Sequence, residues 1–268
     1  MKRLFQWMIA AILFCGTTTF TSCTNEDNPV NPVANLSEKI LGKWEAAERD
    51  GEPITTNKKT IFTFVSATKA YVSASRNSHP EMNPSWMDKL EADVVIIGDK
   101  ITLTFHPDEH KTSVHEFSIT SINGSEFSAI ERVTVRVDGN VILSSEQTVR
   151  FEKTTADYTT AVIGLWEGHC TSEGSVFDDG QEHRWQYNAD GTYVYYVKDG
   201  DDWVPSENTL NEYFVDGTLL CSRWIDQGQE YREWWEINID GDKMNWTALR
   251  QKEDGTTFTA TFEMKKVE

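Results

Sequence analysis

A short phrase occurs twice in this chain of 268 residues, and the repeat restricts the fold more than any other feature. The sequence reads "ILGKWE" at 40–45 and "VIGLWEG" at 162–168, so Gly42 and Trp44 recur 122 positions later as Gly164 and Trp166. Later segments repeat in the same order. "SINGSEF" at 121–127 corresponds to "NIDGDKM" at 238–244, and "TVRFEK" at 148–153 corresponds to "TATFEMKK" at 259–266. We interpret this pattern as a duplication of one structural unit.

The repeated segments have the alternation that is typical of strands. Apolar residues at 258, 260, 262 and 264 alternate with polar residues at 257, 259, 261 and 263. Such a strand buries one face and exposes the other, as strands of antiparallel sheets do. Asn-Gly and Asp-Gly pairs between strand-like runs predict hairpin turns. The chain is therefore predicted to be all-β, and periodicity alone leaves open whether each unit is a sandwich or a closed barrel.

The predicted organisation follows the repeat. We expect a signal peptide at 1–22, a flexible tether at 23–35, a first domain at 36–153, a linker at 154–157 and a second domain at 158–268. About 115 residues are enough for an independent core. Before each Gly-x-Trp, apolar residues recur at helical spacing, which predicts a short capping helix that opens each unit. These residues are Leu36, Ile40 and Leu41, and then Tyr158, Val162 and Ile163.

The first residues predict export. Lys2 and Arg3 precede an apolar run that is too short to span a bilayer, and small residues lead to Cys23. The stretch at 20–23 resembles a bacterial lipobox, which implies acylation of Cys23 and a membrane anchor. "TNEDN" follows and resembles the acidic export tag of Bacteroidetes lipoproteins, although an ordinary acidic linker has the same composition. The expected location is the outer membrane, and display on the cell surface stays open.

The two units together resemble the lipocalin or calycin pattern, and more narrowly the lipocalin-like domains of Bacteroidetes lipoproteins. The likeness rests on the two Gly-x-Trp motifs, the hairpin-linked strands and the closing strand. It implies two tandem antiparallel up-and-down barrels of eight strands. It also implies that Trp44 and Trp166 each plug one barrel end, and that Arg150 on the last strand covers Trp44. The second unit has Thr261 at the position that matches Arg150.

Aromatic residues suggest where a ligand would bind. Seven of the ten tryptophans lie in the second unit. Inward-facing rings there could line a cavity for a small hydrophobic or amphipathic molecule, and the candidate residues are Trp185, Tyr187, Tyr193, Tyr195, Trp235 and Trp246. The same rings could simply fill a small barrel. The rival hypothesis is an interaction module, in which outward rings such as Tyr196, Trp224 and Trp234 bind a glycan or a protein.

The net charge and the missing motifs argue against several other classes of protein. The chain carries 25 basic against 43 acidic side chains, a formal net charge of −18, and such a surface repels nucleic acid. The sequence has no nucleophile elbow, phosphate loop or Cys-x-x-Cys pair. We therefore expect a binding protein without catalytic residues or a cofactor. The oligomeric state stays open.

Two smaller groups of residues have the chemistry for metal binding or for a disulfide. His106, His110 and His115 cluster in "HPDEHKTSVH", but the flanking strand patterns predict a hairpin, which lacks the helical geometry of a zinc pair. No metal is therefore expected. Cys170 and Cys221 remain in the exported chain, where a disulfide between them and two separate thiols are both open.

Overall fold

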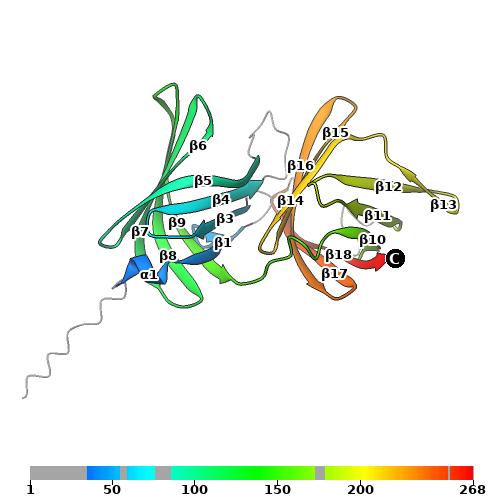
Figure 1. Ribbon diagram of the computed structural model, residues 1–268, viewed down its shortest axis with the longest axis horizontal. Helices are drawn as coiled ribbons and strands as arrows, with labels where there is room; N and C mark the ends of the chain where they lie inside the picture. The colour runs from blue at the N-terminus through cyan, green and yellow to red at the C-terminus, as the bar shows by residue number, and fades with distance from the viewer. Residues whose placement is uncertain (1–34, 55–58, 76–85, 173–178, 253, 268) are drawn as a thin grey trace, which may run out of the picture. The chain divides into compact units, whose positions relative to one another are not determined.

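The computed structural model describes residues 35–54, 59–75, 86–172, 179–252 and 254–267 (Figure 1). The predicted signal peptide, the acylation site Cys23 and the tether up to residue 34 lie outside these residues. Within the described ranges, no helix has the length and apolar character needed to cross a bilayer. Residues 32–268 form one compact unit that contains two antiparallel sheets.

The first sheet is a closed barrel. Its strands follow the order β1-β3-β4-β5-β6-β7-β8-β9, and β1 pairs again with β9. A two-residue strand, β2, extends one edge of β1. The bounds are β1 Gly42–Arg49, β2 Glu52–Pro53, β3 Lys59–Phe64, β4 Lys69–Ser75, β5 Trp86–Ile97, β6 Lys100–Asp108, β7 Lys111–Ile122, β8 Glu126–Val137 and β9 Asn140–Thr154. This half of the chain has the predicted up-and-down topology of eight strands.

The second sheet curls but does not close. Its order is β13-β12-β11-β10-β18-β17-β16-β15-β14. Among the described residues, no ladder joins its two ends, which meet through an isolated bridge between Thr192 and Glu212 and through hydrogen bonds from Tyr213 to Gly191 and Asn188. The bounds are β10 Gly164–Cys170, β11 Glu182–Tyr187, β12 Tyr193–Asp199, β13 Asp202–Pro205, β14 Thr209–Asp216, β15 Leu219–Asp226, β16 Gln229–Asp240, β17 Lys243–Gln251 and β18 Thr257–Val267. The all-β prediction is confirmed, whereas a second closed barrel was wrong. One reason is that the extra hairpin strand β13 pairs with the edge of β12, and the register of β14 shifts between Thr209 and Glu212.

The prediction of a capping helix before each unit was wrong. Before the first barrel, α1 (Leu36–Lys39) is a single turn, and its N-cap residue Asn35 makes no side-chain capping bond. Before the second sheet, Asp157 accepts hydrogen bonds from the backbone and hydroxyl of Thr159, and a turn follows in place of a helix. Four or five residues are too few to offset the cost of starting a helix.

Polar contacts join the two sheets within residues 32–268. The Lys43 Nζ lies 2.5 Å from Asp216 Oδ1, and the Ser73 hydroxyl donates to Asp216 Oδ2 over 2.6 Å. The Thr218 hydroxyl donates to Glu45 over 2.6 Å. Asp216 is 1% exposed, so the ion pair with Lys43 and the bond from Ser73 compensate a carboxylate that has lost its contact with water.

Candidate functional site

The two Gly-x-Trp motifs adopt the same geometry. Trp44 and Trp166 are completely buried, and each indole N–H donates to a backbone carbonyl four residues earlier, that of Ile40 at 2.5 Å and that of Val162 at 2.6 Å. A large ring with its only polar atom satisfied can close the end of a barrel. The motif is therefore a structural element that has been kept in both halves.

Lysine, not arginine, covers each of these tryptophans. Lys153 lies directly across from Trp44 on β9, with its Nζ 5.0 Å from the ring centroid. Lys266 has the same relation to Trp166, at 5.2 Å. Both distances suit a cation–π contact. Arg150, predicted to cover Trp44, instead forms ion pairs with Glu48 and Glu152, because it alternates with Val149 and Phe151, whose side chains are buried.

A cavity of about 520 Å³ is lined mainly by the first barrel, with Arg223 on β15 and Arg232 on β16 contributed by the second sheet. Aromatic rings fill the barrel between the Trp44 plug and this cavity. Phe127 stacks on Phe151 with 4.8 Å between ring centroids, and Phe62 contacts Phe117 with 5.6 Å between ring centroids. The cavity is lined by Ala46, Glu48, Arg49, Ile54, Thr60, Phe62, Trp86, Met87, Phe105, Pro107, Asp108, Lys111, Ser113, His115, Glu131, Val133, Val135, Ile142, Leu143, Ser145, Gln147, Val149, Phe151, Arg223 and Arg232. Its volume falls within the range of roughly 300–1,000 Å³ that small-molecule sites occupy.

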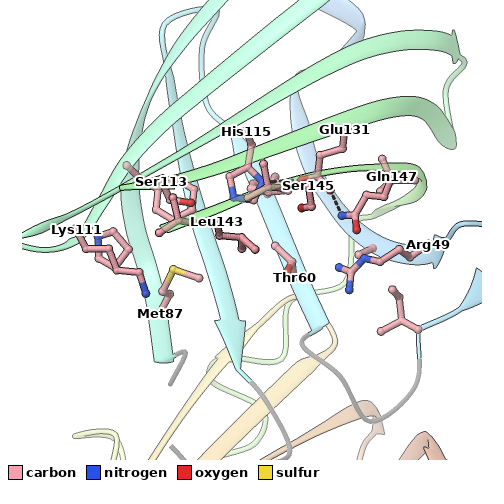
Figure 2. A pocket seen from close by; sticks show the side chains of 18 of the residues that line it. Arg49, Thr60, Met87, Lys111, Ser113, His115, Glu131, Leu143, Ser145 and Gln147 are labelled. Atoms are coloured by element: carbon pink, nitrogen blue, oxygen red, sulfur yellow. Dashed lines mark hydrogen bonds and ion pairs between the residues drawn. The ribbon is translucent and has the colours of Figure 1, made fainter. Parts of the chain in front are cut away.

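A buried polar network forms one wall of the cavity, as Figure 2 shows. The His115 Nδ1 lies 2.6 Å from Glu131 Oε1, and the Gln147 amide donates to the other Glu131 oxygen. Burial acts to raise the pKa of the Glu131 carboxyl. The hydrogen bond and charge of His115, the bond from Gln147 and the charge of Arg49 outweigh it and leave that pKa below its ordinary value. Glu131 is therefore an anion held by its neighbours.

A β-bulge brings Arg49 to this cavity. On β1, Ala46 pairs with Phe151, but the register then shifts and Glu48 pairs with Arg150, followed by Arg49 with Val149. Phe151 and Val149 are buried whereas Arg150 is partly exposed. The extra residue therefore sets Glu48 opposite Arg150, with which it forms an ion pair at the rim of the cavity, and sets Arg49 opposite Val149, where Figure 2 shows its side chain at the cavity. Bulges commonly redirect a side chain in this way.

The aromatic residues predicted to bind a ligand pack against one another in the second sheet. Tyr187, Tyr193, Trp235 and Trp246 are buried, and Trp185 and Tyr195 are half-buried. Trp185 lies 4.8 Å from Trp246 and 5.1 Å from Tyr195 between ring centroids, and Trp246 lies 5.5 Å from Trp235. Tyr187 and Tyr193 form a second contact at 6.0 Å. These rings form the core of the second half, whereas the cavity described above lies in the first.

Cys170 and Cys221 are not joined in a disulfide. Cys170 on β10 is half-buried with its sulfur next to Ser172, and Cys221 on β15 is fully buried. Three strands, β18, β17 and β16, separate β10 from β15 in the sheet. Burial raises the pKa of the Cys221 thiol well above its ordinary value, which leaves it an unreactive thiol.

The histidines that cluster in the sequence lie in different environments in the structure. His106 and His110 are exposed near the β6–β7 turn, whereas His115 is buried inside the barrel. Within the described ranges, no group of three or more His, Cys, Asp or Glu side chains is placed to hold a metal ion. Sequence reasoning missed Arg49, Glu131 and Gln147. Their signal in the sequence is a charged or amide side chain at a strand position that faces inward. Which positions face inward depends on the strand register, which the sequence alone does not give.

The fold and site together define an all-β chain with two barrel-like sheets, one of which encloses a cavity of mixed polarity. No protein-family model matches the chain, and no curated protein matches it. Among solved structures, a double mutant of the vaccine antigen Transferrin Binding Protein B from Haemophilus parasuis is similar with a TM-score of 0.24 and 10% identity, over 79% of this chain and 54% of that one. This chain thus spans about half the length of that antigen.

A protein with unknown function from the DUF3598 family of Nostoc punctiforme gives a TM-score of 0.23 and 10% identity, over 86% of this chain and 97% of that one. The geometry of the site itself must therefore carry the functional argument.

Proposed function

We propose that this protein is a non-catalytic, lipocalin-like binding protein whose first barrel takes up a small amphipathic molecule. The observation that carries the proposal is the cavity of about 520 Å³ that is lined mainly by a closed barrel. Its wall combines apolar residues such as Phe62, Phe105 and Leu143 with the polar network around Glu131. Ligand sites are typically apolar with a few placed polar groups.

The proposal includes a place in the cell. The leader at 1–22 and the lipobox-like stretch before Cys23 support a lipid anchor in the outer membrane, and the acidic stretch after Cys23 supports display at the cell surface. The net charge of −18 argues against a nucleic acid partner. A mass shift of tryptic peptides that start at Cys23, measured on protein from the native host, tests the acylation.

The rival hypothesis of an outward aromatic surface has less support. Trp234 is 1% exposed, and Trp224 stacks on Tyr231 with 5.7 Å between ring centroids. Rings that are already packed offer less surface to a glycan or a protein than exposed rings do. The cavity is therefore the better candidate for the binding site.

A cavity-filling variant tests the proposal. Ser145 lines the cavity and Ser144 is its exposed neighbour on β9, so Ser145→Trp should fill the cavity while Ser144→Trp places the same ring outside. Native and denaturing mass spectrometry of protein purified from its host would detect a retained ligand, and titration with 1-dodecanol would measure uptake. We expect Ser145→Trp to lose ligand and uptake, with Ser144→Trp like the wild type. Equal uptake by the wild type and Ser145→Trp would contradict a site in this cavity.

A further inference from the structure

We infer that the cavity binds a phosphate or sulfate ester, and that Arg223 and Arg232 of the second sheet hold the charged group of this ligand where the two halves meet. The inference rests on the proposed function and specifies its ligand class and the direction of binding. It follows from the pairing of the two arginines, from a buried donor without an acceptor and from the charges around the cavity.

Two arginines stand side by side on the second sheet. Arg223 on β15 and Arg232 on β16 are directly paired across the two strands, so their side chains leave the same face of the sheet. Both line the cavity that is formed mainly by the first barrel. Like charges directly opposite each other on a sheet are destabilising. The pair is therefore unfavourable by itself, and an anion between the two guanidinium groups would relieve the repulsion.

Neighbouring carboxylates satisfy the two arginines only in part. The Arg223 Nε donates to Glu212 over 2.8 Å. The Arg232 Nε donates to Glu230 over 2.8 Å. The Arg232 side chain is only 9% exposed, and its buried Nη1 has no acceptor among the described residues. Because a buried N–H without an acceptor is unfavourable, this atom indicates a place for a ligand oxygen.

The other charged residues around the cavity also favour an anion. The lining cations are Arg49, Lys111, Arg223 and Arg232, and the lining carboxylates are Glu48, Asp108 and Glu131. Each of these carboxylates already accepts a hydrogen bond from another residue. The Nε of Arg49, by contrast, is buried without an acceptor within the described ranges. Donors without partners thus come from both halves, and an anion would supply the acceptors that they lack.

Donors from two different sheets favour a tetrahedral anion over a planar one. A carboxylate has two oxygens in one plane, which suit a single guanidinium. A phosphate or sulfate ester has three terminal oxygens that point in different directions, so one group can accept hydrogen bonds from Arg223, Arg232 and Arg49. The ester linkage leaves the rest of the ligand free to use the apolar part of the cavity.

This apolar part lies on the side of the first barrel. Trp86 marks the border, because its ring lines the cavity and lies 4.9 Å from the guanidinium of Arg223 and 4.8 Å from the ring of Phe214 on β14. The apolar lining beyond it includes Phe62, Met87, Phe105, Val135 and Leu143 (Figure 2). The charged group would therefore bind at the second sheet, with the apolar part of the ligand inside the barrel.

The experiment compares dodecyl phosphate, dodecanoate and 1-dodecanol, each below its aggregation limit, by calorimetric titration of the purified protein at pH 8. The variants are Arg232→Gln and Arg223→Gln, with Arg132→Gln, whose partner Glu146 is exposed, as the control. We expect the wild type to bind dodecyl phosphate about ten- to a hundredfold more tightly than dodecanol, with dodecanoate between them. Each of the first two variants should lose at least about fivefold of this preference and keep the affinity for dodecanol, whereas the control should match the wild type.

Two further measurements refine the test. Arg232→Lys keeps the positive charge next to Glu230 but lacks the guanidinium fork. It should fold like the wild type and still lose at least about threefold of the preference for dodecyl phosphate. Added inorganic phosphate should weaken the binding of dodecyl phosphate and leave the binding of dodecanol unchanged, because it competes only for the arginine pair.

Several outcomes would overturn the inference. These are equal affinities of the wild type for dodecyl phosphate and dodecanol, and a full preference that survives in Arg232→Gln or in Arg223→Gln. Dodecanoate that binds as tightly as dodecyl phosphate would overturn the tetrahedral class, and inorganic phosphate that does so would overturn the ester. If the wild type binds dodecanol and Ser145→Trp does not, the proposed function stands even where the arginine result fails. Failure of all three dodecyl ligands to bind would contradict both.

Discussion

Single residues explain why the Gly-x-Trp motif needs its glycine. Gly42 and Gly164 have φ angles of +117° and +133°, which side chains rarely adopt. A Cβ on Gly42 would lie 2.7 Å from the Cε of Lys153, and one on Gly164 would lie 2.5 Å from the Cε of Lys266. The glycine therefore allows both the backbone conformation and the approach of the lysine that covers the tryptophan.

Replacing this glycine should destabilise the protein through strain. We expect Gly164→Ala to lower the free energy of unfolding by about 1–3 kcal/mol, because the alanine would be held in a rarely populated backbone conformation and would displace Lys266. Urea unfolding followed by tryptophan fluorescence measures the change. Gly124→Ala is the matched control, since a Cβ there meets no atom within 4 Å, and it should stay within about 0.5 kcal/mol of the wild type. Equal stability of the two variants would refute the role given to Gly164.

At the scale of the elements, the two sheets differ in how their ends meet. In the first barrel, β1 and β9 share six paired positions from Lys43 to Arg49. In the described part of the second sheet, the turn before β12 contacts β14 through an isolated bridge between Thr192 and Glu212 and through two hydrogen bonds from Tyr213, to the carbonyls of Gly191 and Asn188. A seam with few hydrogen bonds opens more easily than a continuous ladder.

Hydrogen exchange should reveal this difference. We expect peptides that cover 202–205 and 209–212 to exchange at least about tenfold faster than peptides that cover 43–49 and 149–154, as measured by mass spectrometry. Peptides from the β17–β18 ladder, which has nine paired positions in the same sheet, serve as the protected reference. Protection at 209–212 that equals the reference would show that the second sheet closes in solution.

At the scale of the whole molecule, the buried Asp216 couples the two halves. Its contacts with Lys43 and Ser73 come from the first barrel, and Asp216 itself ends β14 of the second sheet. A buried carboxylate held by an ion pair on one oxygen and a hydrogen bond on the other stabilises the structure only while both partners remain. Loss of either partner leaves a charge with no compensation.

Removal of this carboxylate should weaken the whole structure. We expect Asp216→Ala to lower the free energy of unfolding by roughly 3–5 kcal/mol, because Lys43 would keep its charge with no partner in a largely buried position. Differential scanning calorimetry should show a lower melting temperature and an earlier separate transition of one half. The control Glu146→Ala breaks an exposed pair with Arg132 and should cost no more than about 1 kcal/mol. A melting temperature unchanged in Asp216→Ala would contradict the coupling.

Some of this molecule was predictable from the sequence and some was not. Local signals indicated the strands, the hairpin turns and the paired motifs, because alternation and Gly-containing turns depend on neighbouring residues. The failure of the second sheet to close depends on how its two ends meet near Thr192 and Glu212, and local alternation does not encode whether two ends of a sheet will pair. The site was missed for a similar reason: Arg49 and Glu48 are adjacent in sequence, and only the pairing of β1 with β9 shows which of them faces inward.

The bulge in β1 has a consequence for comparing this protein with relatives. A homologue of the same length whose β1 paired with β9 without the bulge would set Ala47 opposite Arg150 and Glu48 opposite Val149, and positions 48 and 49 would each face the other way. The Glu48 side chain would then face inward with Val149 and Arg49 would face outward, which would reverse the charge at this point of the cavity wall. A change of register alone would thus alter the wall with no change in sequence, so an alignment of such relatives should be checked against strand register before the lining residues are compared.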